Sequence, residues 1–121
     1  MHRYWVYLSA MPQAFKVARL RDIPAGSIRP LTVLNRDILI INLDGVLYGV
    51  EARCPHMNYP LELGSLEGRT LRCGFHYAEF DITTGEVISQ PMNTRSPVRN
   101  LETYRVRIED SDIVVELPDY L

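Results

Sequence analysis

Residues 54–76 read CPHMNYPLELGSLEGRTLRCGFH and hold both cysteines of the 121-residue chain and two of its three histidines. They form two short groups, Cys-Pro-His at 54–56 and Cys-Gly-Phe-His at 73–76, so each group offers one thiolate and one imidazole. At this composition, a chance repeat of such a pairing is on the order of one in a thousand. Metal ligation by all four side chains is therefore the favoured interpretation.

The residue types alone leave the metal open. Two cysteines and two histidines are ligands for a tetrahedral zinc ion and also for an iron–sulfur cluster with mixed ligation. A zinc finger usually pairs Cys with Cys and His with His around a helix, whereas here each group supplies one residue of each type. A single zinc ion could still accept this arrangement, so a zinc-stabilised structural module stays as an alternative.

The bulk composition excludes several classes of protein. The apolar fraction of 46% and the charged fraction of 23% are typical of a soluble globular protein, and we expect one domain over residues 1–121. A net charge of −2 gives no basic surface for nucleic acid, and no apolar stretch is long enough for a membrane helix. Two cysteines form no secreted disulfide framework, which favours the cytoplasm. Residues 1–11 are expected to form a loose N-terminal extension.

The rest of the chain is β-rich, with glycine and proline at the turns and no convincing amphipathic helix. Asp44-Gly45 lies between two β-rich runs and predicts a two-residue hairpin, and residues 109–112 are expected to turn a second hairpin. The run 38–43 reads as a strand that is buried on both faces. Strands are expected at 15–20, 31–34, 38–43, 46–50, 104–108 and 113–117. This pattern predicts an all-β protein, a small antiparallel β-sandwich or barrel.

The cysteine and histidine spacing resembles a known family. Cys-x-His, sixteen intervening residues and then Cys-x-x-His is similar to the ligand motif of Rieske-type 2Fe–2S proteins. The likeness extends to Pro55, Phe80-Asp81 and Thr84-Gly85-Glu86, and it covers about residues 15–117. In particular, the chain resembles the soluble Rieske ferredoxins of bacterial oxygenase systems.

The resemblance implies one 2Fe–2S cluster, with Cys54 and Cys73 on the inner iron and His56 and His76 on the outer iron. It also implies a fold of three small antiparallel sheets, with the cluster at the tip of a loop-rich subdomain, here residues 53–92. The segment 89–97 would be the proline-bearing loop that covers the cluster in relatives.

By the same resemblance, the protein would be a one-electron carrier with no catalytic residue of its own. It would shuttle electrons from a flavoprotein reductase to a terminal oxygenase through transient contacts. A small Rieske subunit of a larger reductase complex, such as one acting on nitrite, is the alternative. A catalytic oxygenase fragment is a poor interpretation, because only His2 remains for a mononuclear iron site that needs two histidines and a carboxylate, so this chain could not build that site alone.

Residues near the four ligands refine this expectation. The family usually has glycine where this chain has Tyr77. Family members with a high reduction potential have hydroxyl-bearing residues at the positions of Ala78 and Phe80. Fewer hydrogen bonds to sulfur predict a reduction potential toward the low end of the Rieske range. Arg53, Arg69 and Arg72 are expected to be solvated strand or loop residues. The expected apolar docking rim consists of Met57, Tyr59, Pro60, Phe75, Tyr77, Pro91 and Met92.

Overall fold

The computed structural model describes residues 13–118, so the predicted extension at residues 1–11 lies outside the described range. The strands are β1 Gln13–Arg19, β2 Ile28–Val33, β3 Arg36–Leu43, β4 Val46–Glu51, β5 Ser65–Glu67, β6 Thr70–Arg72, β7 Glu79–Asp81, β8 Val87–Ser89, β9 Thr103–Glu109 and β10 Asp112–Leu117. Two single 3₁₀ turns, η1 Leu20–Asp22 and η2 Leu61–Leu63, complete the elements. The all-β prediction is confirmed. In the described part of the chain, no helix is long and apolar enough to cross a membrane.

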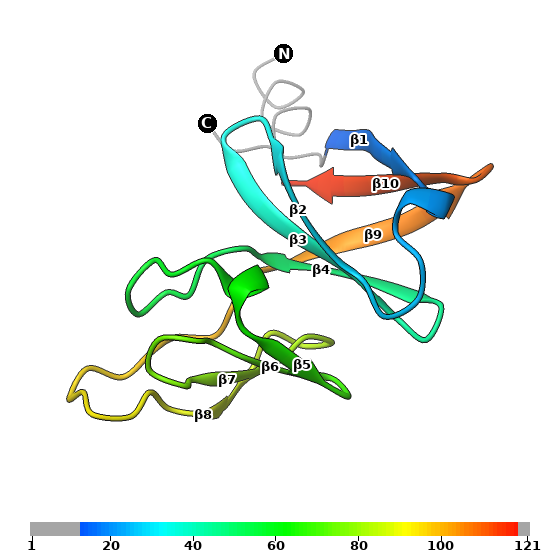
Figure 1. Cartoon of the computed structure of the whole chain (residues 1–121). Helices are drawn as coiled ribbons and strands as arrows, with labels where there is room; N and C mark the ends of the chain where they lie inside the picture. Colours follow the sequence, from blue (N-terminus) through cyan, green and yellow to red (C-terminus); the bar gives the residue numbers. More distant parts are fainter. Residues whose placement is uncertain (1–12, 119–121) are drawn as a thin grey trace, which may run out of the picture.

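The larger sheet has the strand order β1-β10-β9-β4-β3-β2, and every pair of neighbouring strands in it is antiparallel. Figure 1 shows this sheet curled, so that β1 and β2 from the two ends of the order approach each other. The family resemblance implied three separate sheets. Here β9 pairs with both β10 and β4, and it therefore joins two of them into one.

Two-residue turns set the register of the predicted hairpins. Asp44 and Gly45, between β3 and β4, have φ values of 53° and 93°, as the predicted turn requires. Asp110 and Ser111, between β9 and β10, have φ values of 53° and 85°. A third turn contains Leu34, at the end of the run predicted as strand 31–34, with a φ of 55°. Both predicted hairpins are confirmed.

Strand β3 separates two hydrophobic cores, because successive side chains of a strand point to opposite faces. Ile38 and Ile40 lie fully buried in the core enclosed by the curled sheet. Leu39 and Ile41 lie fully buried in a second core, which extends beneath the smaller sheet and includes both cysteines. The prediction of a strand buried on both faces is confirmed.

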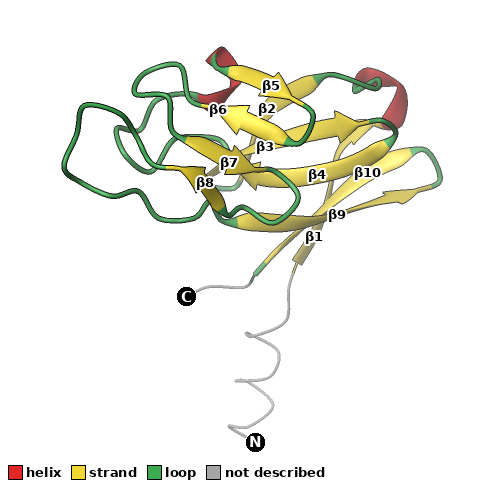
Figure 2. Ribbon diagram, turned by 90° about the horizontal axis from the view of Figure 1, so that it is seen from below, coloured by secondary structure: helices red, strands yellow, loops and turns green. Residues whose placement is uncertain are grey.

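The smaller sheet has the strand order β5-β6-β7-β8, and the loop between β6 and β7 holds Cys73 and His76. None of these three-residue strands was predicted from the sequence, and residues 53–68 in particular read as irregular. Fully buried Leu71 and Phe80, opposite each other on β6 and β7, attach the sheet to the second core. Figure 2 shows that the long loops gather at one end of the molecule, beyond β7 and β8.

Candidate metal centre

Two loops with the same backbone design carry the four predicted ligands. The first loop follows β4, and the amide of Cys54 donates a hydrogen bond of 2.8 Å to the carbonyl of Tyr59. The second loop joins β6 to β7, and the amide of Cys73 donates a hydrogen bond of 2.8 Å to the carbonyl of Ala78. In each loop a cysteine amide thus closes the turn on the fifth residue after it, so the loops repeat one local structure.

Each loop also has a left-handed residue at the fourth position after its cysteine. These residues are Asn58 with a φ of 57° and Tyr77 with a φ of 63°. Asparagine tolerates this conformation better than other residues with a side chain, whereas a bulky residue adopts it at a cost. Tyr77, where the family usually has glycine, thus has a backbone conformation that glycine adopts more readily.

The loops bring the two cysteines and the two histidines together. Cys54 and Cys73 are unpaired in any disulfide and only 2% exposed each, whereas both histidines are half-buried. The ring centroids of His56 and His76 lie 5.1 Å apart, with the rings edge to face. Thiols therefore lie inside, and imidazoles lie nearer the surface.

The surroundings of Cys73 disfavour the ionised form of its thiol. Burial raises the pKa of the Cys73 thiol to about 11, against the opposing effect of a hydrogen bond from the Phe75 amide. The adjacent Cys54 thiol raises this pKa further through charge repulsion and a hydrogen bond. Two cysteines buried in one apolar core have the donor chemistry of an iron–sulfur site, which takes up thiolates.

The arrangement fits a two-iron cluster better than a single zinc ion. The four side chains pair like with like: both cysteines are buried in one core, and the ring centroids of the two histidines lie 5.1 Å apart. A tetrahedral zinc site needs four donors at one point, whereas a Rieske cluster needs two thiolates on one iron and two imidazoles on the other. Two thiolates neutralise a core of two ferric ions and two sulfides, so the loaded site carries little net charge into the apolar core.

Segment 89–97, for which the family resemblance implied a covering loop, lies against both loops. The amide of Met92 donates a hydrogen bond of 2.7 Å to the carbonyl of His76. The Oγ1 atom of Thr94 lies 3.2 Å from Nε2 of His56. Gln90 closes the base of the segment, because its amide group accepts from Val98 N at 2.7 Å and donates to Val98 O at 3.3 Å. Sequence reasoning did not identify Thr94, since it is 38 residues from His56 and matches no motif.

The seven predicted rim residues differ in exposure. Met57, Phe75, Tyr77 and Met92 are 54%, 44%, 48% and 55% exposed, respectively. Tyr59 and Pro60 are half-buried, and the Tyr59 ring stacks on Phe75 with centroids 5.7 Å apart. Pro91 is buried, so its inclusion in the exposed rim was wrong. We name the four exposed residues Met57, Phe75, Tyr77 and Met92 the apolar tip.

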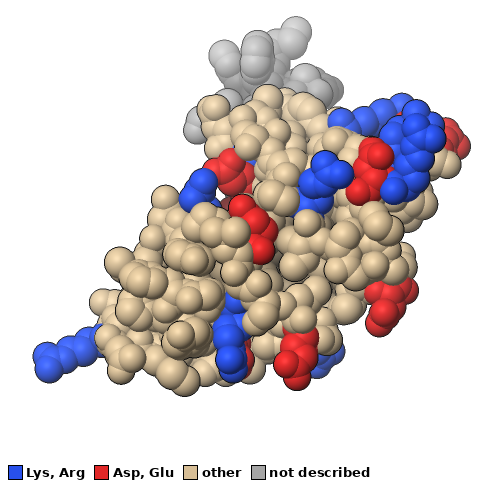
Figure 3. All heavy atoms as spheres, viewed as in Figure 1, with Lys and Arg blue, Asp and Glu red and all other residues tan. Residues whose placement is uncertain are grey.

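The surroundings of the apolar tip are poor in charge. Residues 54–61, 73–78 and 87–94 contain no Lys, Arg, Asp or Glu. On the face shown in Figure 3, one Lys or Arg side chain projects from the end of the molecule that carries these loops, and the rest of that end is free of charged side chains. The nearby arginines form exposed ion pairs instead: Arg53 with Asp37, Arg69 with Asp81 and Arg72 with Glu79, at 3.4, 3.3 and 2.8 Å.

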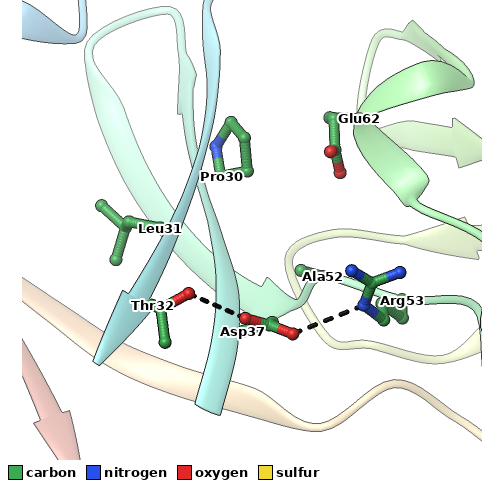
Figure 4. Close-up of a pocket in the computed structure, with 7 residues that line it drawn as sticks. All are labelled: Pro30, Leu31, Thr32, Asp37, Ala52, Arg53 and Glu62. Atoms are coloured by element: carbon green, nitrogen blue, oxygen red, sulfur yellow. Dashed lines mark hydrogen bonds and ion pairs between the residues drawn. The ribbon is translucent and has the colours of Figure 1, made fainter. Parts of the chain in front are cut away.

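A cavity of about 220 Å³ lies away from the histidines, between β2, β3 and η2 (Figure 4). Its lining residues are Pro30, Leu31, Thr32, Asp37, Ala52, Arg53 and Glu62. Asp37 accepts hydrogen bonds from Thr32 at 2.8 Å and from Arg53 at 3.4 Å, and both contacts hold the pKa of this carboxyl below its usual value. These polar groups are already paired, and the cavity offers no second reactive centre.

Comparisons with known proteins agree with this geometry. The family model described as "Rieske [2Fe-2S] domain" matches residues 13–114. The ferredoxin component of the naphthalene 1,2-dioxygenase system of Pseudomonas aeruginosa is 30% identical over 98 residues, which cover 81% of this chain and 89% of that protein. The ferredoxin subunit of the 3-phenylpropionate/cinnamic acid dioxygenase of Shigella boydii is 32% identical over 99 residues, covering 81% and 88%.

Solved structures share the fold. A chain of the complex of reduced oxygenase and oxidized ferredoxin in carbazole 1,9a-dioxygenase matches with a TM-score of 0.75 at 22% identity, covering 89% of this chain and 96% of that one. The Sphingomonas yanoikuyae B1 ferredoxin matches with a TM-score of 0.72 at 24% identity, covering 88% and 100%. At these identities, the structures support the architecture alone.

Proposed function

The chain belongs to the Rieske [2Fe-2S] family, and from this premise we propose that it is the ferredoxin component of an oxygenase system. It carries one 2Fe–2S cluster, which takes up and releases a single electron when bound. The donor would be a flavoprotein reductase and the acceptor a terminal oxygenase. The protein itself would be an electron-transfer component and not an enzyme, as the names of its relatives indicate for those proteins. We place this exchange in the cytoplasm, where both cysteines stay reduced.

The ligands would be Cys54 and Cys73 on one iron and His56 and His76 on the other. The observation that supports this assignment is the repeated loop: each copy carries one cysteine and one histidine, the two cysteines are buried in one core, and the two imidazole rings lie 5.1 Å apart. Neutral imidazoles in place of two thiolates make the centre easier to reduce, because the electron is added to a site with less negative charge. The sequence supplies no other cysteine that could complete a four-thiolate site.

The residues around the ligands would keep the potential toward the low end of the family's range. Ala78 and Phe80 are both buried and carry no hydroxyl, so neither side chain can donate a hydrogen bond to sulfur. Fewer donors stabilise the electron-rich reduced state less. This environment suits a carrier that is supplied from a nicotinamide nucleotide through a flavin.

The apolar tip would be the docking surface for the terminal oxygenase. One of its four side chains, Phe75, packs on His76 with ring centroids 4.2 Å apart, and Arg95 in segment 89–97 is the one charged residue of the three loops that carry the apolar tip. Small contacts of this kind suit a transient electron-transfer encounter, which typically buries less than about 1,200 Å². The complementary surface on the oxygenase should be an apolar, uncharged depression.

Metal analysis of single variants tests the ligand assignment. The purified protein should contain two irons and two acid-labile sulfides, and its reduced form should give a paramagnetic signal with nitrogen coupling. His76→Ala and Cys73→Ser should lose that signal, whereas His2→Ala, which removes the third histidine, should keep it. One zinc per chain, or an intact signal in His76→Ala, would contradict the assignment.

The carrier role is tested separately, by anaerobic rapid mixing. The reduced protein should be reoxidised by the oxygenase of the naphthalene 1,2-dioxygenase system, and the oxidised protein should be reduced by the flavoprotein reductase with a nicotinamide nucleotide. Stable co-purification with a large reductase subunit, together with no electron transfer to an oxygenase, would favour the alternative of a reductase subunit.

A further inference from the structure

The two histidines have different hydrogen-bond environments. Nε2 of His56 lies 3.2 Å from Oγ1 of Thr94. Within the described residues, the ring of His76 contacts the rings of His56 and Phe75 and has no hydrogen-bond partner. The two predicted imidazole ligands are therefore not equivalent in this chain.

We propose that Thr94 is a positioning residue for His56, which fixes the ring by its Nε2 atom and lowers the reduction potential of the centre. This inference rests on the proposed assignment of His56 as a ligand. With Nε2 held by Thr94, Nδ1 is the ring nitrogen left to bind iron. His76 then presents the imidazole edge that stays open to a partner.

The fold places the Thr94 hydroxyl with little freedom. The amide of Ser96 donates to Oγ1 of Thr94 at 3.3 Å, which orients the oxygen. The segment that carries Thr94 is closed at its base by Gln90 and attached to the second loop through Met92 N and His76 O. Thr94 therefore contacts His56 of the first loop, while the segment that carries Thr94 is hydrogen-bonded to the second loop.

The direction of the electronic effect follows from the proton on the ring. An imidazole bound to a metal through Nδ1 keeps its proton on Nε2, and this N–H donates to Oγ1 of Thr94. A donated hydrogen bond raises the basicity of the ligand nitrogen, which stabilises the more positive, oxidised iron. Removing the hydroxyl should therefore make the centre easier to reduce.

Three variants of the loaded protein test this inference. Thr94→Val keeps the shape without the hydroxyl, and Thr94→Ser keeps the hydroxyl. Thr103→Val is the control, at an exposed position of β9 that pairs with Val50 of β4 and not with either loop. In Thr94→Val, the equilibrium constant for reduction against a reference dye should rise about threefold, a shift of ~30 mV at 59 mV per tenfold for one electron. Thr94→Ser and Thr103→Val should stay near the original value. Pulsed paramagnetic resonance should show that only one of the two nitrogen couplings changes in Thr94→Val.

The outcomes separate this inference from the proposed function. A full iron and sulfide content with an unchanged potential in Thr94→Val would overturn the role of Thr94, and so would an equal shift in Thr94→Ser. If Thr94→Val fails to retain the cluster, Thr94→Ala gives the same comparison. Absence of nitrogen coupling in the unmodified protein would instead contradict the ligand assignment, whatever the Thr94 variants show.

Discussion

Replacing Tyr77 by glycine should stabilise the protein, although it removes a large side chain. Tyr77 has a φ of 63° and is about half exposed, so it adopts an unfavourable backbone conformation and gains little from burial. The left-handed conformation costs a residue with a Cβ atom about 1–2 kcal/mol. Glycine removes this cost, but its greater freedom in the unfolded chain lowers the free energy of unfolding by roughly 0.5–1 kcal/mol.

A paired comparison isolates the backbone effect. Tyr77→Gly and Tyr77→Ala both remove the ring, and they differ only in the Cβ atom that the positive φ disfavours. We expect the glycine variant to be more stable than the alanine variant by about 1 kcal/mol. With a urea dependence of about 2 kcal/mol per molar, this corresponds to a midpoint higher by roughly 0.5 M. The assay is anaerobic urea unfolding of the loaded protein, followed by far-ultraviolet circular dichroism after a fixed incubation.

Met57 provides the matched control in the other loop. It is similarly exposed but does not have a positive φ, so Met57→Gly should be less stable than Met57→Ala by about 0.5–1 kcal/mol. The sign of the glycine–alanine difference should therefore reverse between the two positions. If Tyr77→Ala proves as stable as Tyr77→Gly, the backbone at this position carries no strain and the reasoning is refuted.

Three further outcomes are expected. Gly64→Ala should lower the cluster content of the purified protein, since an added Cβ atom would overlap the backbone carbonyl of Arg72, next to Cys73; a normal iron content would contradict this. Burial opposes ionisation of Asp81, but hydrogen bonds from Thr83 outweigh it and hold the pKa of Asp81 below its ordinary value. The unmodified protein should therefore be more stable than Asp81→Asn by its full margin above about pH 4, and this margin should shrink as pH falls through the lower pKa that Asp81 has in the folded state. Unfolding midpoints at several pH values measure the margin. A margin independent of pH would argue against this role of Asp81. The rate of electron transfer to the oxygenase should change less than about threefold between about 0.05 and 0.5 M salt, because the apolar tip is uncharged; a steep fall with salt would place the contact elsewhere.

The sequence predicted those parts of the fold that have a strong local signal. Alternation of apolar residues identified β1 and β9, and a continuous apolar run identified β3. Asp44-Gly45 identified a turn that needs positive φ at both positions. The spacing of cysteines and histidines identified the four residues that the loops bring together. Strands β5 to β8 were missed because three residues are too few for a period of two to emerge.

Contacts between residues far apart in the sequence could not be predicted either. Thr94 reaches His56 across 38 residues, and only the closure of segment 89–97 brings them together. Pro91 was assigned to the exposed rim from its neighbours, but the same closure turns it inward. By contrast, the constraint at Tyr77 was visible in the sequence, because the resemblance showed glycine at a position where the backbone would need it.

Strand β3 contributes alternate side chains to both cores, so the core inside the curled sheet and the core that contains the cysteines share one strand. Neither core can unfold alone without exposing one apolar face of β3 to water. We therefore expect the brown-red colour of the protein and its overall architecture to vanish in a single step, so that a simple visible-light reading would report on the integrity of the entire molecule.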